Sequence, residues 1–398
     1  MSPGKVFFAV FLTAGVLAAS AFGQDNSSQA GDEQLWQYEL TVPRPDRPDK
    51  APVAHLWLPD GVETIRGLII GDSIRHGGTV CRDPHVRKAA EDKKLGIVFF
   101  DPGLDAVFNW VENDSDKRLL RTLEKLAEET GHPELELVPW LTVGHSTGGI
   151  YARNVAYWKP DRVIGILHLK SGNLQDGLFH LKDDYLRKHP EAKYRTLAGV
   201  PFLAINGEYE EYGPKGGDLG VGLRSRYSLH AEDKSKRNQT QWVMIRMQLL
   251  DRRRKNPDNL MALVVERDGG HVSWNEDMSK LSAQFVRSAA DARIPEDAPT
   301  GEVVQCKRVS AEDGWLMDPD IKDPEHAPAP YEEYPGDKTL AFWVVDKDLA
   351  EALWEYHKSG EWKDPDPTAD EPVEQRYYPP EILQDPVDTL DRDEQQGD

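Results

Sequence analysis

Cysteine, the residue of disulfides and of thiolate metal sites, is scarce in the sequence. Its 398 residues include only two cysteines, Cys81 and Cys306. No Cys/His cluster has the spacing of a zinc site, and neither an H-E-x-x-H nor an EF-hand pattern occurs. We therefore expect no catalytic metal and no cofactor. A disulfide between the two cysteines is open to an exported protein, but sequence alone does not place their Cα atoms within bridging range.

Long apolar runs are also scarce, and the longest lies at the N-terminus. Lys5 precedes the apolar run Val6–Ala19, and Ala21-Phe22-Gly23 places small residues at a cleavage site. This pattern predicts a signal peptide over residues 1–23, with Ala19-Ser20-Ala21 as an alternative cleavage site. The run is too short to span a bilayer comfortably, which disfavours a membrane anchor. We expect a secreted or periplasmic protein without an integral membrane segment after cleavage, and a disordered linker over residues 24–33.

Basic charge is scarce only in the C-terminal region. Residues 311–398 hold 26 acidic and 7 basic side chains, a net charge of −19, so residues 1–310 carry only −2 of the total of −21. This balance argues against nucleic acid as a partner and gives no polybasic membrane signal. Within this region, Lys338–Val345 is typical of a strand and Asp346–Lys358 of an amphipathic helix. We expect a docked appendage over residues 304–363 and an acidic, proline-rich disordered tail over 364–398.

Strand-like and helix-like segments alternate between these ends. The expected strands are Gln34–Val42, Val53–Leu58, Gly67–Gly71, Leu95–Phe100, Val138–Val143, Arg162–Leu169, Gly199–Ile205 and Leu260–Val265. The expected helices are Val86–Lys93, a segment around Leu119–Ala127 that Gly131 ends, Ile150–Trp158, Thr240–Arg253 and Ser279–Ala292. The alternation predicts an α/β fold with a mostly parallel sheet and helices on both faces.

One motif carries chemistry in this context. Gly144-His145-Ser146-Thr147-Gly148-Gly149 follows a strand-like run and precedes a plausible helix, and it fits G-x-S-x-G. Such a turn is sharp, so the residues at positions 144 and 148 must be small, and the turn exposes the serine hydroxyl. The first amides of the helix then face the reaction centre, where the Thr147 N–H could donate to an oxyanion. We interpret Ser146 as a nucleophile.

Residues 50–293 resemble the α/β-hydrolase superfamily, specifically its secreted esterase-like members. The resemblance depends on the Ser146 motif, on Ile205-Asn206-Gly207-Glu208-Tyr209-Glu210, and on Asp268-Gly269-Gly270-His271, which follow predicted strands in the family's order. It implies an α/β-hydrolase catalytic domain over residues 34–303. It also implies the order serine, acid and histidine for the catalytic residues.

A serine hydroxyl needs a base within reach, and the base needs an orienting acid. His271 is the expected base because its Gly-Gly-His loop follows a buried strand. The family's G-x-x-D spacing selects Glu210 as the acid, and Glu208 and Glu211 remain alternatives. We interpret the neighbouring His145 as structural, because its side chain leaves the turn in another direction.

The second oxyanion donor should follow the strand Gly67–Gly71. The Asp72 or Ser73 N–H is expected to serve, although Arg75-His76-Gly77-Gly78 resembles the HGGG loop of lipases at an unusual distance from its strand. The insertions 171–198 and 212–238 could cover the substrate site.

The sequence therefore favours an exported serine hydrolase, most simply a carboxylesterase that acts through an acyl-enzyme on a small or polymeric ester. A peptidase or acyltransferase on the same triad is an alternative, because fold does not separate these activities. A non-catalytic, hydrolase-like binding protein is another.

Overall fold

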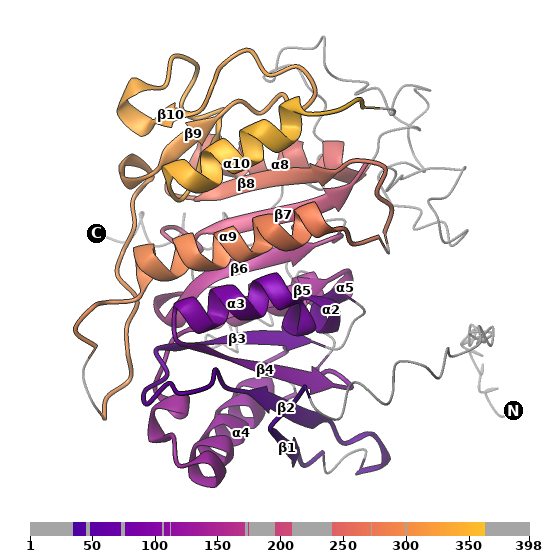
Figure 1. The fold of residues 1–398 in the computed structure, drawn as a ribbon, viewed down its shortest axis with the longest axis vertical. Helices are drawn as coiled ribbons and strands as arrows, with labels where there is room; N and C mark the ends of the chain where they lie inside the picture. Colours follow the sequence, from indigo (N-terminus) through magenta and orange to yellow (C-terminus); the bar gives the residue numbers. More distant parts are fainter. Residues whose placement is uncertain are drawn as a thin grey trace, which may run out of the picture. The chain divides into compact units, whose positions relative to one another are not determined.

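An eight-stranded sheet forms the centre of the molecule (Figure 1). The computed structural model describes residues 35–44, 48–72, 76–105, 107–111, 113–171, 174, 196–208, 241–271, 273–298 and 301–362. The strand order is β1-β2-β4-β3-β5-β6-β7-β8. The strands are β1 (Tyr38–Thr41), β2 (Val53–Trp57), β3 (Gly67–Asp72), β4 (Leu95–Asp101), β5 (Trp140–His145), β6 (Val163–Leu169), β7 (Phe202–Gly207) and β8 (Met261–Glu266).

Burial separates the two kinds of strand in this sheet. β1 and β2 pair antiparallel at one edge and alternate between more and less buried residues. β2 also pairs antiparallel with β4. The strands β3 to β8 pair parallel with one another and are buried on both faces, apart from the last residue of β4. Continuous apolar sequence is what such doubly covered strands require. The predicted α/β fold class, with a mostly parallel sheet, is confirmed.

Helices cover both faces of the sheet. In Figure 1, α2, α3 and α9 lie in front of it, and the fainter α5 and α8 lie behind. Their bounds are α2 (His76–Arg82), α3 (Pro84–Asp92), α4 (Ser115–Thr130), α5 (Thr147–Trp158), α8 (Gln241–Lys255) and α9 (Glu276–Arg293). Gly131 ends α4 in the left-handed conformation, as predicted, whereas Asp114 at its start makes no side-chain cap. Asn275 caps α9 by accepting the Met278 N–H.

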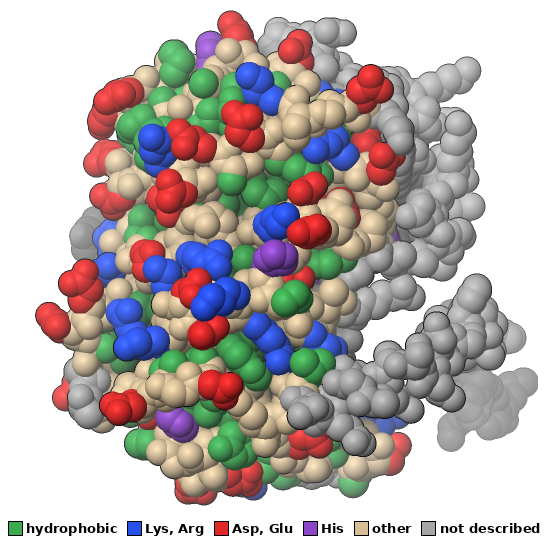
Figure 2. Space-filling model, viewed as in Figure 1, with side chains coloured by type: hydrophobic (Ala, Val, Ile, Leu, Met, Phe, Trp, Pro, Cys, Tyr) green, Lys and Arg blue, Asp and Glu red, His purple; other side chains and the backbone are tan. Residues whose placement is uncertain are grey.

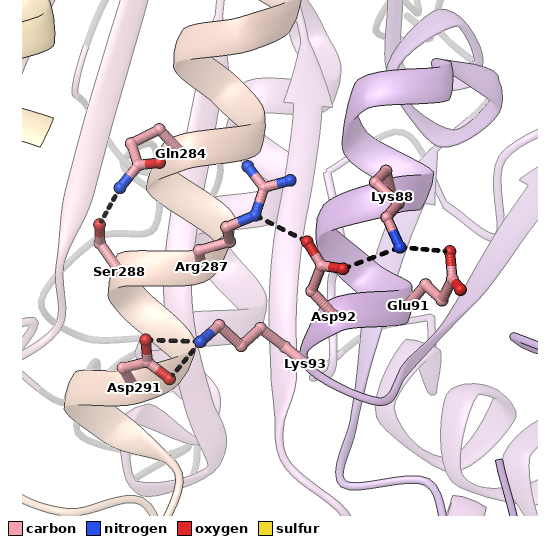
Figure 3. Close-up of polar contacts among 8 residues, drawn as sticks. All are labelled: Lys88, Glu91, Asp92, Lys93, Gln284, Arg287, Ser288 and Asp291. Carbon is pink, nitrogen blue, oxygen red and sulfur yellow. Dashed lines mark hydrogen bonds and ion pairs between the residues drawn. The ribbon is translucent and has the colours of Figure 1, made fainter. Parts of the chain in front are cut away.

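Charged side chains join α3 to α9 across the front face (Figure 3). Arg287 pairs with Asp92 at 3.1 Å, and Lys93 pairs with Asp291 at 2.7 Å. Lys88 extends this network along α3. Figure 2 shows basic and acidic side chains interspersed over this face. Exposed pairs of this kind contribute little individually, so the network orients two helices whose buried sides pack together.

The C-terminal segment contains β9 (Trp315–Met317), β10 (Ala329–Pro330), β11 (Phe342–Val344) and α10 (Lys347–Lys358). The three strands form a small antiparallel sheet in the order β10-β9-β11, and α10 contacts α9. Arg253 of α8 is fully buried and donates to the Ala341 and Lys338 carbonyls. The predicted strand and helix are both present, and their apolar sides are buried against the main sheet and its helices.

Cys81 and Cys306 are both free thiols, so the structure contradicts a disulfide between them. Cys81 lies in α2, which follows the carboxyl end of β3. The Cys306 amide donates to the Asp161 carbonyl just before β6, at the amino ends of the parallel strands. Burial raises the pKa of Cys81 to about 12 and that of Cys306 to about 11, so both thiols stay protonated.

The expected signal peptide, linker and acidic tail lie outside the described residues, as does the insertion 212–238. By its contacts the chain divides into residues 1–35 and 36–398, and every described residue except Leu35 belongs to the second unit. Among the helices that the structure describes, none combines the length and apolar character that a membrane crossing needs.

Candidate functional site

Four polar residues of the sequence motifs lie at or near one edge of the sheet. Ser146 follows β5, Glu208 follows β7 and His271 lies five residues after β8, while Asp72 is the last residue of β3. These strands are parallel, so their carboxyl ends meet at the same edge. The topology thereby places at the same ends of the strands three motifs that are far apart in the sequence, those of Ser146, Glu208 and His271.

Ser146 occupies a strained turn between β5 and α5. Its φ of 57° and ψ of −121° place it in a backbone region that residues other than glycine rarely adopt. The turn is possible because Gly144 has no side chain: a Cβ there would lie 1.7 Å from the Gly148 carbonyl oxygen. Backbone strain of this kind marks functional sites. The geometry is that of the nucleophile elbow that the sequence predicts.

The loop after β8, residues 267–271, carries His271 and is held from two sides at its start. The Asp268 amide, at a φ of 53°, donates to Glu208 Oε2 at 3.0 Å. The preceding amide, of Arg267, donates to the Tyr356 hydroxyl at 2.9 Å. Gly207 allows the close approach of the loop, because a Cβ there would lie 2.4 Å from the Gly269 carbonyl oxygen.

His145 holds the end of the same loop. It is fully buried, and its Nε2 lies 2.8 Å from the His271 carbonyl oxygen. A carbonyl oxygen only accepts, so the Nε2 atom of His145 carries the proton of this bond. The two imidazole rings are 4.8 Å apart between centroids and tilted by 52°. His145 therefore joins the elbow directly to the His271 loop, in keeping with the structural role expected from the sequence.

The three candidate acids differ in what the structure describes. Glu208 is fully buried and accepts the Asp268 amide, while its own amide donates to the Glu266 carbonyl. Glu210 and Glu211 lie outside the described residues. One oxygen of Glu208 is therefore engaged in holding the loop that carries His271.

A buried ion pair that the sequence analysis missed lies beneath this loop. Lys170 follows β6 and pairs with Glu266 at the end of β8, and both side chains are almost fully buried. The Ser273 hydroxyl donates to the same carboxylate oxygen of Glu266 at 2.7 Å. Buried charges need such partners. The only signal in the sequence is a charged residue at the end of each of two apolar strands.

The predicted oxyanion donors lie in two places. Thr147 is the first residue of α5, where helical amides have no partner within the helix. Asp72 ends β3 at the same sheet edge, and Ser73 lies outside the described residues. Gly77 lies within α2, where a Cβ would come 2.0 Å from the Asp72 carbonyl oxygen. In the structure, the segment that resembles an HGGG loop includes the start of a helix that packs closely on β3.

Burial sets the charge of two groups beneath the elbow. Tyr151 of α5 is fully buried, and burial together with the Asp72 carboxylate raises its pKa well above the usual value. His168 of β6 is also fully buried, and burial, with Arg153 and Arg252 nearby, lowers its pKa well below the usual value. Both groups therefore stay neutral at physiological pH.

Within the described ranges, no group of three or more His, Cys, Asp or Glu side chains could hold a metal ion. The arrangement at the sheet edge instead combines a strained serine, helical amides and a histidine loop. Together with the strand order, the elbow after β5 and the histidine loop after β8 define the α/β-hydrolase fold.

No protein-family model matches this chain, and no curated protein matches its sequence. Solved structures resemble it weakly. LpqC, a poly(3-hydroxybutyrate) depolymerase from Bordetella parapertussis, is 18% identical over 65% of this chain and 92% of its own, with a TM-score of 0.37. An S-formylglutathione hydrolase from Agrobacterium tumefaciens is 13% identical over 64% and 93%, also with a TM-score of 0.37. Likenesses this weak carry no weight for activity or substrate.

Proposed function

We propose that this protein is a serine hydrolase of the carboxylesterase type, with Ser146 as nucleophile and His271 as general base. The observation that carries the proposal is the strained Ser146 turn, joined through His145 to the loop of His271. A strained serine at a helix N-terminus, beside a histidine on a fixed loop, is an arrangement suited to acyl transfer.

In the proposed mechanism, the Ser146 hydroxyl attacks the ester carbonyl as His271 takes its proton. The developing oxyanion accepts the Thr147 N–H and a second N–H from Asp72 or Ser73. His271 then protonates the leaving alcohol, and an acyl-enzyme remains on Ser146. Water, deprotonated by His271, attacks the acyl carbon, and the acid product leaves with the serine restored.

For the orienting acid we propose Glu210, with Glu208 as the alternative. The Glu208 carboxylate already accepts the Asp268 amide, which suits a residue that holds the loop. The G-x-x-D spacing from Gly207 points to Glu210. A carboxylate in this role keeps the imidazole in the correct tautomer and stabilises its charged form during reaction.

Labelling with a fluorophosphonate tests the proposal on the full chain. We expect one adduct per molecule, mapped by peptide mass spectrometry to Ser146. Ser146→Ala should not react, whereas Ser310→Ala, which changes a remote serine bonded to Asp313, should label normally. An unlabelled wild-type protein would favour a non-catalytic binding protein. An adduct at another serine would instead assign the nucleophile to that residue.

Substrate choice needs a second experiment, because the triad also suits peptidases and acyltransferases. Turnover should be compared among activated short-chain esters, a matched anilide and a polyester film, with and without an added alcohol acceptor. We expect ester hydrolysis to be fastest. Faster anilide cleavage or dominant transfer to the alcohol would indicate the alternatives.

We also propose that the protein is exported and cleaved before Gln24, from the pattern of residues 1–23. N-terminal sequencing of protein recovered outside the cytoplasm tests this. An intact N-terminus would contradict cleavage.

A further inference from the structure

The C-terminal helix α10 contacts the loop that carries His271. We propose that α10 holds the loop of His271 in position for catalysis, with Tyr356 and Arg267 as positioning residues. This inference rests on the proposed function for its kinetic consequences. The contacts that carry it belong to the structure alone.

Arg267 and the end of α10 form several contacts. The Arg267 amide donates to the Tyr356 hydroxyl at 2.9 Å, and its guanidinium donates to the Tyr356 carbonyl and to the Ser359 hydroxyl. The guanidinium carbon also lies 4.1 Å from the centroid of the Tyr356 ring. One arginine thus binds α10 through both its backbone and its side chain.

The helix that receives these bonds is itself firmly placed. Asp346 caps its start by accepting the Leu349 amide at 2.9 Å. Its inner face is buried through Leu349, Leu353 and His357. A helix anchored along its length provides a fixed point for the loop, since a packed interior deforms little.

The constraint passes from Arg267 to His271 through four residues of backbone. The two consecutive amides of Arg267 and Asp268 are held from different elements, by Tyr356 of α10 and by Glu208 after β7. His145 then fixes the carbonyl at the end of the loop. Removing the α10 contact would release the Arg267 amide at the start of the loop, while Glu208 and His145 still hold the residues that follow. Misplacement of a catalytic group by about 1 Å can cost on the order of 100-fold in rate.

Two conservative variants test the proposal, Tyr356→Phe and Arg267→Lys. The first removes the hydroxyl that accepts the amide, and the second keeps the charge but not the planar guanidinium. We expect kcat to fall about 10- to 100-fold in each, with KM nearly unchanged. Fluorophosphonate labelling should slow by a similar factor but still reach one adduct per chain.

Matched controls change the same residue types elsewhere in the attachment of this segment. Tyr334→Phe alters a tyrosine that packs against His326, and Arg253→Lys alters the arginine that holds Ala341 and Lys338. Both should lower the melting temperature without lowering kcat. A merely structural role for Tyr356 would reduce the number of adducts per chain at an unchanged rate per site, and that outcome would overturn the proposal.

Hydrogen exchange separates this inference from the proposed activity. The amides of Arg267 and Asp268 should exchange faster in Tyr356→Phe than in wild type, and remain protected in Tyr334→Phe. Unchanged protection in Tyr356→Phe would refute the contact itself. Faster exchange without any esterase activity in the wild type would instead refute the proposed function and, with it, the catalytic role of α10.

Discussion

The elbow and the His271 loop, which lie at the same sheet edge, are built in different ways. The elbow is formed from its own sequence: Gly144 makes room for Gly148, and Ser146 takes the strained conformation between them. The His271 loop is held by residues 60 to 126 positions away, namely Glu208, Tyr356 and His145. A local motif is therefore recognisable from sequence, whereas the position of His271, the proposed base, depends on the whole fold.

The largest effect should come from the elbow itself. Ser146→Ala removes the proposed nucleophile, and we expect kcat for an activated ester to fall about 10⁴- to 10⁶-fold, because the proposed acyl-enzyme forms on this serine. Steady-state kinetics at saturating substrate measure this. Turnover within tenfold of wild type would show that Ser146 carries no chemistry.

Next come the carboxylates after β7. Glu210→Gln should lower kcat about 10³- to 10⁴-fold if it orients His271. Glu208→Gln should cost much less, because a glutamine carbonyl can still accept the Asp268 amide. Kinetics of both variants, with Glu211→Gln as the matched control, decide the order. The reverse order would assign the acid to Glu208.

A methyl group at Gly207 should disturb the loop from below. In Gly207→Ala the new Cβ would lie 2.4 Å from the Gly269 carbonyl oxygen, so we expect a loss of about 1–3 kcal/mol of stability and about 10- to 100-fold in kcat. The control is Gly131→Ala, which meets open space but places an L-residue at a φ of 72°, so it should cost about 1–2 kcal/mol of stability without affecting kcat. Denaturant melts and kinetics measure both. Equal kcat in the two variants would argue against a fixed loop.

Loss of the bond from His145 should have a smaller effect. His145→Phe removes the donor to the His271 carbonyl, and we expect kcat to fall about 10-fold, in line with the roughly 1–3 kcal/mol of a buried unsatisfied group. His145→Gln keeps an N–H donor and should recover part of the rate. If the glutamine variant is no faster than the phenylalanine variant, this hydrogen bond does not explain the effect.

The smallest effect concerns stability as a function of pH. Burial, and then Arg267, lowers the pKa of His357 to about 3, compared with 6.5 in the unfolded chain. Between these values the unfolded state binds the proton and the folded state does not. The contribution of neutral His357 is therefore complete above pH 6.5 and is lost progressively as the pH falls toward 3.

Urea melts at pH 7.5 and 5 measure this loss. The slope due to His357 cannot exceed about 1.4 kcal/mol per pH unit. His357→Phe should flatten the dependence by that amount or less, and an unchanged slope would contradict a buried neutral imidazole.

Apolar periodicity was sufficient to predict the core. The uninterrupted apolar strands such as β8 predicted a doubly covered parallel sheet, and Gly131 predicted the C-terminal end of α4. These signals are local, because apolar periodicity and helix-end residues are read from positions close in sequence. Boundaries differed by a few residues, as for β5, which begins at Trp140 just after Pro139.

The sequence by itself determined the elbow, because a turn this tight needs glycine at position 144 and exposes the side chain of Ser146. Only the tertiary structure decided what holds the loop of His271. Three contacts join segments that no sequence spacing relates. They are the Lys170–Glu266 pair, the bond from His145 to the His271 carbonyl, and the hydrogen bonds of Arg267 to α10. The tertiary structure also decided that Cys81 and Cys306 stay apart, because they lie at opposite ends of the parallel strands. Such contacts follow from the spatial order of the strands in the sheet. The residues of one strand do not by themselves specify which strands lie beside it.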